Sequence, residues 1–294
     1  MRRIVVFFIF FVLISSSVIA KQSDSIQIKG SDTMVNLGQA WAESFMELNP
    51  EALIAVTGGG SGTGIAALMN RSCDIAQSSR EMSQKEYDLA QSKGLTVKEI
   101  QVGIDAIAFV VHPDNPASQI SIDRLSDIFT GKITNWKQVG GNDEPILALS
   151  REKNSGTHVY VLEEVVRKGK KDSADEFAPN VLMLPSSQAI EQEVSTSKAA
   201  IGYFGLGYLN DKVKALHILN PKTQDFIVPS VATAVDGTYP LARPLFFYLP
   251  QEPQGLVKEF VDFVLSDKGQ QIVLDMHFVP LNKKEPAQSQ SVSS

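Results

Sequence analysis

The sequence follows one repeated order: a short apolar strand, then a polar loop rich in glycine, serine and threonine, then an amphipathic helix. Residues 25–29 predict a strand, residues 30–33 a loop, and the following segment a helix that ends before Pro50, because proline cannot continue a helix. The order recurs over residues 53–70 and again over residues 146–166. Strands that alternate with helices in this way predict an α/β fold with a largely parallel sheet.

The rest of the chain predicts further elements of ordinary length. The glycine-rich segment 199–209 has a β-like pattern, and residues 167–176 form a charged surface loop. A chain of 294 residues is longer than a typical single domain, so we expect two lobes. Strands are predicted at residues 74–77, 103–112, 231–238 and 245–249, and helices at residues 122–129 and 256–265.

The N-terminus predicts an export signal. Two arginines precede an apolar run at residues 4–14, and residues 18–20 offer a cleavage site. A transmembrane anchor is the alternative, but it needs about 20 apolar residues and this run is shorter. The only cysteine is Cys73, so no cysteine follows the signal to carry a lipid. We therefore expect removal of residues 1–20 and a periplasmic protein without a lipid anchor.

Charge and residue types exclude several functions. The formal net charge is −6, which argues against nucleic acid or an anionic membrane as the main partner. The four histidines lie far apart and show no metal-ligand spacing, so neither a metal site nor a cofactor is predicted. An anionic ligand would have to be captured by local fields rather than by net charge.

Residues 151–158 have the composition of a site for a tetrahedral oxyanion. Arg151 supplies a fixed positive charge, and Ser155, Gly156 and Thr157 supply hydroxyls and backbone N–H groups before an amphipathic run. The first N–H groups of a helix lack intrahelical partners and bind anions readily. A second Ser-Gly-Thr at residues 61–63 also opens a helix. Two other interpretations stay open: Ser155 as an ordinary N-cap and Arg151 as a surface residue.

The glycine-rich run at residues 58–64 does not fit the better-known loops of enzymes. No lysine follows it, which excludes a P-loop, and Thr63 stands where a nucleophile elbow requires glycine. Gly62, Gly64 and Ala67 loosely match a dinucleotide-binding pattern, which is weak alone and unexpected in an exported protein. Glycine here is better explained by the close approach of a ligand to backbone N–H groups.

Several motifs together make the chain resemble a known family from about residue 26 to residue 281. They are Gly30-Ser31-Asp32-Thr33, Gly60-Ser61-Gly62-Thr63-Gly64, residues 128–136 (IFTGKITNW), Arg151 with Ser155-Gly156-Thr157, Ala200-Ile201-Gly202-Tyr203 and Tyr239-Pro240-Leu241. The chain is similar to the phosphate-binding proteins that serve bacterial phosphate ABC importers. The resemblance implies a type II periplasmic binding protein fold, with two α/β lobes, two crossover strands and a ligand cleft between the lobes.

We expect one discontinuous lobe at residues 21–105 and 239–282 and the other at residues 106–238. The polar segment 283–294 is expected to be a disordered tail.

The resemblance also implies the ligand-binding residues. They are Thr33 and the N–H group of Met34, Ser61, Ser79, and the cluster Arg151, Ser155, Gly156 and Thr157; the adjoining Ser31, Asp32, Gly62 and Arg80 are further candidates. In the best-known members an aspartate occupies the position of Ser79 and accepts the proton of hydrogen phosphate. A hydroxyl can both donate and accept, so the basis of discrimination against sulfate stays open. Asp32 is the nearest acidic candidate for the missing acceptor.

The resemblance implies a binding protein and not an enzyme. We expect it to capture inorganic phosphate, as a monomer without a cofactor, and to deliver it to the membrane permease of an ABC importer. A binding protein for another tetrahedral oxyanion, such as sulfate or molybdate, is the first alternative. A secreted phosphoryl-transfer enzyme is the second, but it would need metal ligands or an activated nucleophile, and neither is visible.

Overall fold

The computed structural model describes residues 25–281. The predicted signal at residues 1–20 and the predicted tail at residues 283–294 lie outside the described residues. Within residues 25–281, no helix is both long and apolar enough to cross a membrane.

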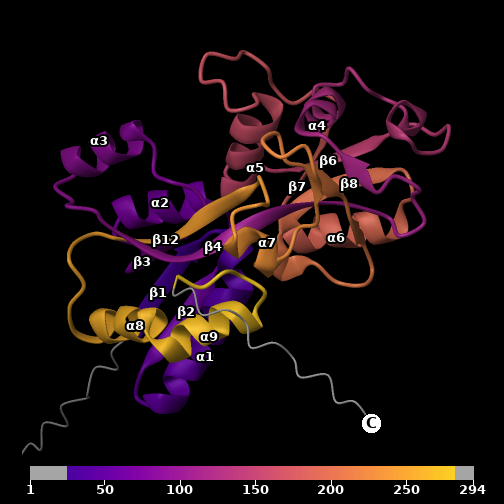
Figure 1. The fold of residues 1–294 in the computed structure, drawn as a ribbon. Coiled ribbons are helices and arrows are strands. Elements are labelled where there is room, and N and C mark those ends of the chain that lie inside the picture. Colours follow the sequence, from indigo (N-terminus) through magenta and orange to yellow (C-terminus); the bar gives the residue numbers. More distant parts are fainter. Residues whose placement is uncertain (1–24, 282–294) are drawn as a thin grey trace, which may run out of the picture.

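One continuous sheet runs through both lobes (Figure 1). Its strands have the order β2-β1-β3-β12-β4-β8-β6-β7, with β9 paired to β4. Their bounds are β1 Ser25–Gly30, β2 Leu53–Thr57, β3 Ile75–Ser78, β4 Lys98–Val111, β6 Leu147–Arg151, β7 Leu182–Leu184, β8 Ala200–Gly205, β9 Lys214–Ala215 and β12 Ala242–Leu249. A small second sheet joins β5 (Gln119–Ile120), β10 (His217–Leu219) and β11 (Phe226–Ile227).

The first lobe is built around β1, β2 and β3, which are parallel. Successive residues of a strand point to opposite faces, so neighbours in β12 serve two cores. Phe247 packs with Trp41 and Phe260 on one face, while Tyr248 packs with Leu68 on the other. The helices of this lobe are α1 Val35–Leu48, α2 Ser61–Met69, α3 Gln84–Ser92, α8 Gly255–Leu265 and α9 Asp267–Asp275.

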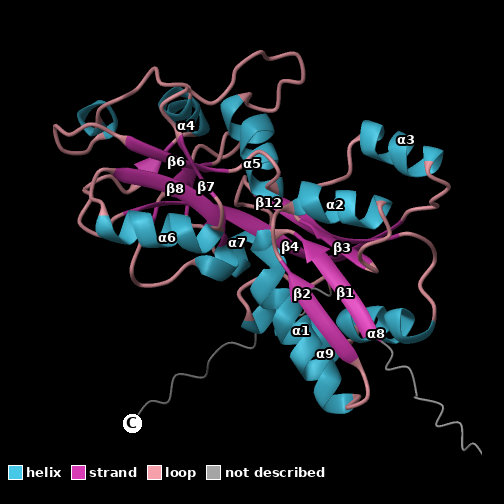
Figure 2. Ribbon diagram, turned by 180° about the vertical axis from the view of Figure 1, so that it is seen from behind, coloured by secondary structure: helices cyan, strands magenta, loops and turns pink. Residues whose placement is uncertain are grey.

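The second lobe is built around β6, β7 and β8 and has its own core of aromatic rings. Phe129 makes edge-on contacts with Phe109, at a centroid distance of 5.8 Å, and with Tyr203, at 5.6 Å. Helices α4 and α5 cover one side of these strands and α6 the other (Figure 2). The helices are α4 Ile122–Phe129, α5 Gly156–Val161 with a π-helical continuation at Leu162–Val166, α6 Ser187–Thr196 and α7 Val231–Val235.

Two neighbouring strands, β4 and β12, connect the lobes. The first half of β4 pairs antiparallel with β12, from Lys98 opposite Leu249 to Ala106 opposite Ala242. Its second half pairs with β8 of the second lobe, beginning with Ile107 opposite Gly205. A single strand therefore belongs to both lobes, in agreement with the crossover strands that the resemblance implied.

The strand predicted at residues 231–238 is wrong, because the structure has the short helix α7 there. Val231, Thr233 and Val235 are β-branched and favour a strand on local preference. Ser230 and Thr233 form a reciprocal capping arrangement, in which each side chain bonds the backbone N–H of the other. This cap satisfies N–H groups that a helix start leaves unpaired and outweighs the weak strand preference.

Candidate functional site

The predicted site residues lie at the carboxyl ends of β1, β2 and β3, which are parallel to one another, and of β6, which runs in the opposite direction. The carboxyl ends of strands are where α/β sheets bind ligands. The site residues are Ser31, Asp32, Thr33 and Met34 after β1, Ser61 and Gly62 after β2, Ser79 and Arg80 after β3, and Arg151 and Ser155–Thr157 at and after β6. The first three groups belong to the first lobe and the fourth to the second lobe.

The loop after β1 is shaped by Gly30. Its φ is +140°, and a Cβ there would lie only 2.1 Å from the carbonyl oxygen of Gln77, so no other residue fits. The Ser31 N–H donates to the same oxygen at 2.7 Å. Thr33 and Met34 are buried in a short 3₁₀ turn that leads into α1, and the Met34 N–H donates to the Ser31 carbonyl at 3.2 Å.

The glycine loop after β2 is shorter than the predicted run of residues 58–64, because α2 already begins at Ser61. Ser61 therefore occupies the first turn of a helix, where backbone N–H groups are unpaired. Its Oγ accepts from the Ser79 N–H at 3.1 Å and lies 3.4 Å from the Ser79 Oγ. The Ser31 Oγ donates to the Ser79 Oγ at 2.9 Å, which completes a chain of three buried hydroxyls.

The loop after β6 places the second lobe against these hydroxyls. Ser155 is the N-cap of α5, since its Oγ accepts from the N–H groups of Thr157 and His158. A Cβ on Gly156 would lie 2.4 Å from the Ser61 Oγ and 2.7 Å from the Ser79 Oγ. The Oγ1 atoms of Thr33 and Thr157 are 2.9 Å apart. Five buried hydroxyl groups from the two lobes thus meet in one place.

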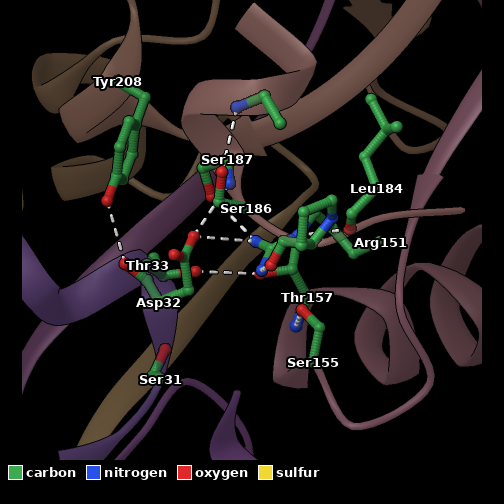
Figure 3. Close-up of polar contacts among 12 residues, drawn as sticks. Ser31, Asp32, Thr33, Arg151, Ser155, Thr157, Leu184, Ser186, Ser187 and Tyr208 are labelled. Atoms are coloured by element: carbon green, nitrogen blue, oxygen red, sulfur yellow. Dashed lines mark hydrogen bonds and ion pairs between the residues drawn. The ribbon is translucent and has the colours of Figure 1, made fainter. Parts of the chain in front are cut away.

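Arg151 is buried and held by residues 184–187, from the end of β7 to the first residue of α6 (Figure 3). Its Nη1 donates to the Ser187 Oγ at 2.9 Å, its Nη2 to the Pro185 carbonyl at 2.8 Å, and its Nε to the Leu184 carbonyl at 3.4 Å. Burial lowers the pKa of Arg151, and the nearby Asp32 carboxylate opposes that effect. The surface interpretation of this arginine is excluded.

The structure gives Asp32 protein partners instead of an open acceptor position. Its Oδ2 lies 3.1 Å from the Arg151 Nη1 and accepts the Ser187 N–H at 2.8 Å, both in the second lobe. Its carbonyl oxygen accepts from the Tyr208 hydroxyl at 2.9 Å (Figure 3). Asp32 therefore links the lobes, and this carboxylate does not replace the acceptor that is missing at position 79.

Arg80 and Gly62 also form hydrogen bonds with protein groups outside the hydroxyl cluster. Arg80 makes two parallel hydrogen bonds to Glu86, at 2.8 and 2.7 Å. Burial raises the pKa of Glu86, but the bonds from Arg80 and Ser83 outweigh burial and hold that pKa below its ordinary value. The Gly62 N–H donates to the Asn154 carbonyl of the second lobe at 3.0 Å. These two candidates flank the hydroxyl cluster and do not complete it.

Sequence reasoning missed Arg243, on β12. Its Nη2 donates to the Thr157 Oγ1 at 2.8 Å and the Thr33 Oγ1 at 3.3 Å, one from each lobe. The same nitrogen lies 2.9 Å from the Oδ2 of Asp105, which is fully buried on β4. Arg243 is the only charged residue of β12, and Asp105 is the only one in the apolar stretch 102–111 of β4; that pattern is the signal that could have indicated them.

A cavity of about 740 Å³ adjoins the cluster between the lobes. Ser79 and Arg243 line it together with Tyr160, and the rest of the lining includes charged side chains of both signs as well as apolar ones. Within residues 25–281, no group of three or more histidine, cysteine, aspartate or glutamate residues could hold a metal ion. The site therefore offers hydroxyls, backbone N–H groups and arginines, which are donors for an oxyanion.

Comparison with known proteins agrees with this geometry. The family model of the PBP superfamily domain matches residues 15–268. The chain is 32% identical over 279 residues to the phosphate-binding protein PstS of Pseudomonas aeruginosa, covering 89% of this chain and 84% of that protein. It is 35% identical over 266 residues to PstS of Bacillus subtilis, covering 89% and 82%.

Solved structures give the same result. A substrate-binding protein assigned to a phosphate ABC transporter, with bound phosphate, from Clostridium perfringens has a TM-score of 0.78 and 32% identity, covering 88% of this chain and all of that one. An ABC-type phosphate transport receptor from Vibrio cholerae has a TM-score of 0.68 and 28% identity, covering 87% of this chain and all of that one. The chain belongs to the PBP superfamily and, within it, to the non-enzymatic family of phosphate-binding proteins of ABC transporters.

Proposed function

We propose that this protein captures inorganic phosphate between its two lobes and delivers it to the membrane permease of an ABC importer. One observation carries the proposal beyond family membership: hydroxyls from both lobes meet beside two buried arginines at the carboxyl ends of the strands. Such a set offers donors from several directions, as a tetrahedral anion requires.

The proposed binding mode needs no chemical step. Each buried arginine already has a carboxylate partner, Arg151 with Asp32 and Arg243 with Asp105. The anion would therefore be held by oriented dipoles and hydrogen bonds, not by a large excess of positive charge. These interactions strengthen when water leaves, because the local dielectric falls on closure.

The ligand contacts remain a proposal by position. Thr33, Ser61, Ser79 and Thr157 would bind through hydroxyls, Gly156 through its backbone N–H group, Arg151 through its guanidinium, and Ser155 by fixing the first turn of α5. The Met34 N–H would have to exchange its hydrogen bond to the Ser31 carbonyl for one to the anion. Support comes from the convergence of these groups, which joins residues up to 124 positions apart in the chain.

An oxyanion other than phosphate remains a candidate ligand, because position 79 is a serine and not an aspartate. Asp32 and Asp105 lie beside residues of the hydroxyl cluster, and each is paired with an arginine. Neither of these two carboxylates is then free to favour a protonated anion over sulfate. Sulfate and molybdate therefore remain alternative ligands.

Export and lobe boundaries are further parts of the proposal. The signal pattern supports a periplasmic protein that meets its permease at the membrane. We place the first lobe at residues 21–105 and 239–282 and the second at residues 106–238. The hydrophobic cores support this division, because Val102 packs in one core and Ala106 in the other. On the return crossing, Leu241 still packs in the core of the second lobe and Leu245 in that of the first, so the cores favour a crossing a few residues after 239.

The deciding experiment is calorimetric titration of phosphate-stripped protein with phosphate, sulfate and molybdate. We expect one phosphate per chain with a dissociation constant at or below the micromolar level, equivalent to about 8 kcal/mol or more. Affinity weaker than millimolar, or tighter binding of sulfate, would overturn the assignment. Incubation with a phosphate ester separates the enzymatic alternative, since a binding protein releases no alcohol.

A further inference from the structure

Arg243 carries a role that goes beyond joining two strands. We propose that it binds the captured oxyanion directly through its Nη1, and that Asp105 fixes the guanidinium for this purpose. The inference rests on the proposed function, because it adds a ligand to the same site.

The position of the guanidinium supports direct contact. Arg243 is only 2% exposed, and its Nη2 reaches Thr33 in the first lobe and Thr157 in the second. The two terminal nitrogens of a guanidinium share one carbon, so Nη1 lies in the immediate surroundings of the same threonines. Arg243 also lines the cavity between the lobes, next to Ser79.

The second observation is that Arg243 has a hydrogen-bond donor without a partner. Among the described residues, Arg243 Nη1 is buried and has no hydrogen-bond partner. A buried N–H group without a partner is unfavourable and is rare in folded proteins. Arg151 differs, since its Nε, Nη1 and Nη2 each have a protein acceptor. Of the two arginines, Arg243 is therefore the one with an uncommitted nitrogen.

Asp105 orients this donor from the opposite side. Its Oδ2 accepts from the Arg243 Nε at 3.2 Å and Nη2 at 2.9 Å, which leaves Nη1 pointing elsewhere. The carboxylate is itself fixed, because its Oδ1 accepts the Leu206 N–H at 3.2 Å. Gly205 leaves the space for it, since a Cβ there would lie 2.5 Å from Oδ2.

The competing explanation is purely structural. The Asp105–Arg243 pair joins the two crossover strands, and the Arg243 guanidinium lies 5.4 Å from the centre of the Tyr160 ring. If the pair only held the two strands together, loss of Arg243 and loss of Asp105 would weaken phosphate binding to the same extent. Direct binding predicts an asymmetry, because only Arg243 donates to the anion.

The test compares Arg243→Met with Asp105→Asn by calorimetry with inorganic phosphate, alongside thermal unfolding with and without phosphate. Arg243→Met should weaken phosphate at least tenfold and up to about a hundredfold, as expected for a lost hydrogen bond to a charged group. Asp105→Asn keeps the donor and should stay within about tenfold of the wild type. Its melting temperature should rise more with phosphate than that of the wild type, because the anion then neutralises an unpaired Arg243.

Two further variants keep the comparison decisive. Arg243→Met/Asp105→Asn removes both charges and avoids a lone buried carboxylate, and it should bind as weakly as Arg243→Met. Arg167→Met removes an arginine paired with Glu176 on the surface, and it should bind like the wild type. Equal weakening by Arg243→Met and Asp105→Asn, or an Arg243→Met affinity within threefold of the wild type, would overturn the inference. If the wild type itself fails to bind phosphate, the proposed function fails with it.

Discussion

The carboxylate of Asp32 lies 3.1 Å from the guanidinium of Arg151, and the two residues belong to different lobes. The same oxygen accepts the Ser187 N–H at the start of α6. The contact is therefore a bond across the cleft, which exists only when the lobes are close together. This contact between the lobes therefore stabilises the closed form.

Asp32→Asn should weaken this bond and favour opening. The amide keeps an acceptor for Ser187 but loses the ionic attraction to Arg151, a loss of about 1.5–3 kcal/mol for a charged hydrogen bond. We expect roughly tenfold or greater weakening of phosphate binding, measured by calorimetry. Small-angle scattering should show a larger radius of gyration for the ligand-free variant. Asp143→Asn, which breaks an exposed pair with Lys137, is the control and should change neither quantity. Unchanged affinity in Asp32→Asn would contradict the role of the interlobe bond.

Gly156→Ala should prevent full closure. The added methyl group would lie 2.4 Å from the Ser61 Oγ, and that atom belongs to the other lobe. Overpacking of this kind costs about 1–3 kcal/mol, so phosphate affinity should fall by about tenfold or more, while the melting temperature without phosphate changes little. Gly103→Ala is the matched control, because its methyl group would meet its nearest neighbour at 3.4 Å. Normal binding by Gly156→Ala would show that the lobes need not approach this closely.

Ser79→Asp should change selectivity more than affinity. An ionised carboxylate only accepts hydrogen bonds, so it suits a protonated phosphate and repels sulfate. We expect the ratio of phosphate to sulfate affinity, measured by paired titrations, to rise at least tenfold. Ser79→Ala removes the hydroxyl without adding charge and should lower both affinities to a similar extent. An unchanged ratio in Ser79→Asp would show that position 79 does not contact the anion.

Glu86→Gln should flatten the acid side of the stability curve. Arg80 and Ser83 hold the pKa of Glu86 below its ordinary value of 4.5, so the unfolded chain binds a proton more readily than the folded chain. The resulting stabilisation is complete above the ordinary pKa and is lost as the pH falls through the lower folded value. The melting temperature of the wild type should therefore fall more steeply in this acid range than that of Glu86→Gln. Parallel curves for the two proteins would contradict this account.

The sequence predicted the elements whose signals are local. The helix that ends before Pro50, the helix at residues 122–129 and the strand that leads into Arg151 all agree with the structure. Periodicity and terminating residues are properties of a short window, so they can be interpreted without the rest of the fold. Residues 231–238 were misassigned because the Ser230 cap carries a weaker signal than three β-branched residues.

The partners within the site could not be predicted in the same way. Arg243 and Asp105 are 138 residues apart, and only the register of β12 on β4 makes them neighbours. Asp32 was a candidate acceptor because it adjoins Thr33, but the approach of α6 decides its actual partners. Such choices depend on three-dimensional proximity, which composition and spacing do not encode.

The strand β4 is shared by both lobes, and this has a mechanical consequence. If the lobes turn about β4 and β12, an atom moves in proportion to its distance from those strands. Asp105 and Arg243 lie on these strands and would keep their places, whereas Gly62, in the first turn of α2, and Asn154, in the loop after β6, lie beyond the strand ends and would separate. An anion that enters the open protein would thus meet Arg243, which does not move with either lobe, and the two lobes would then close around the anion.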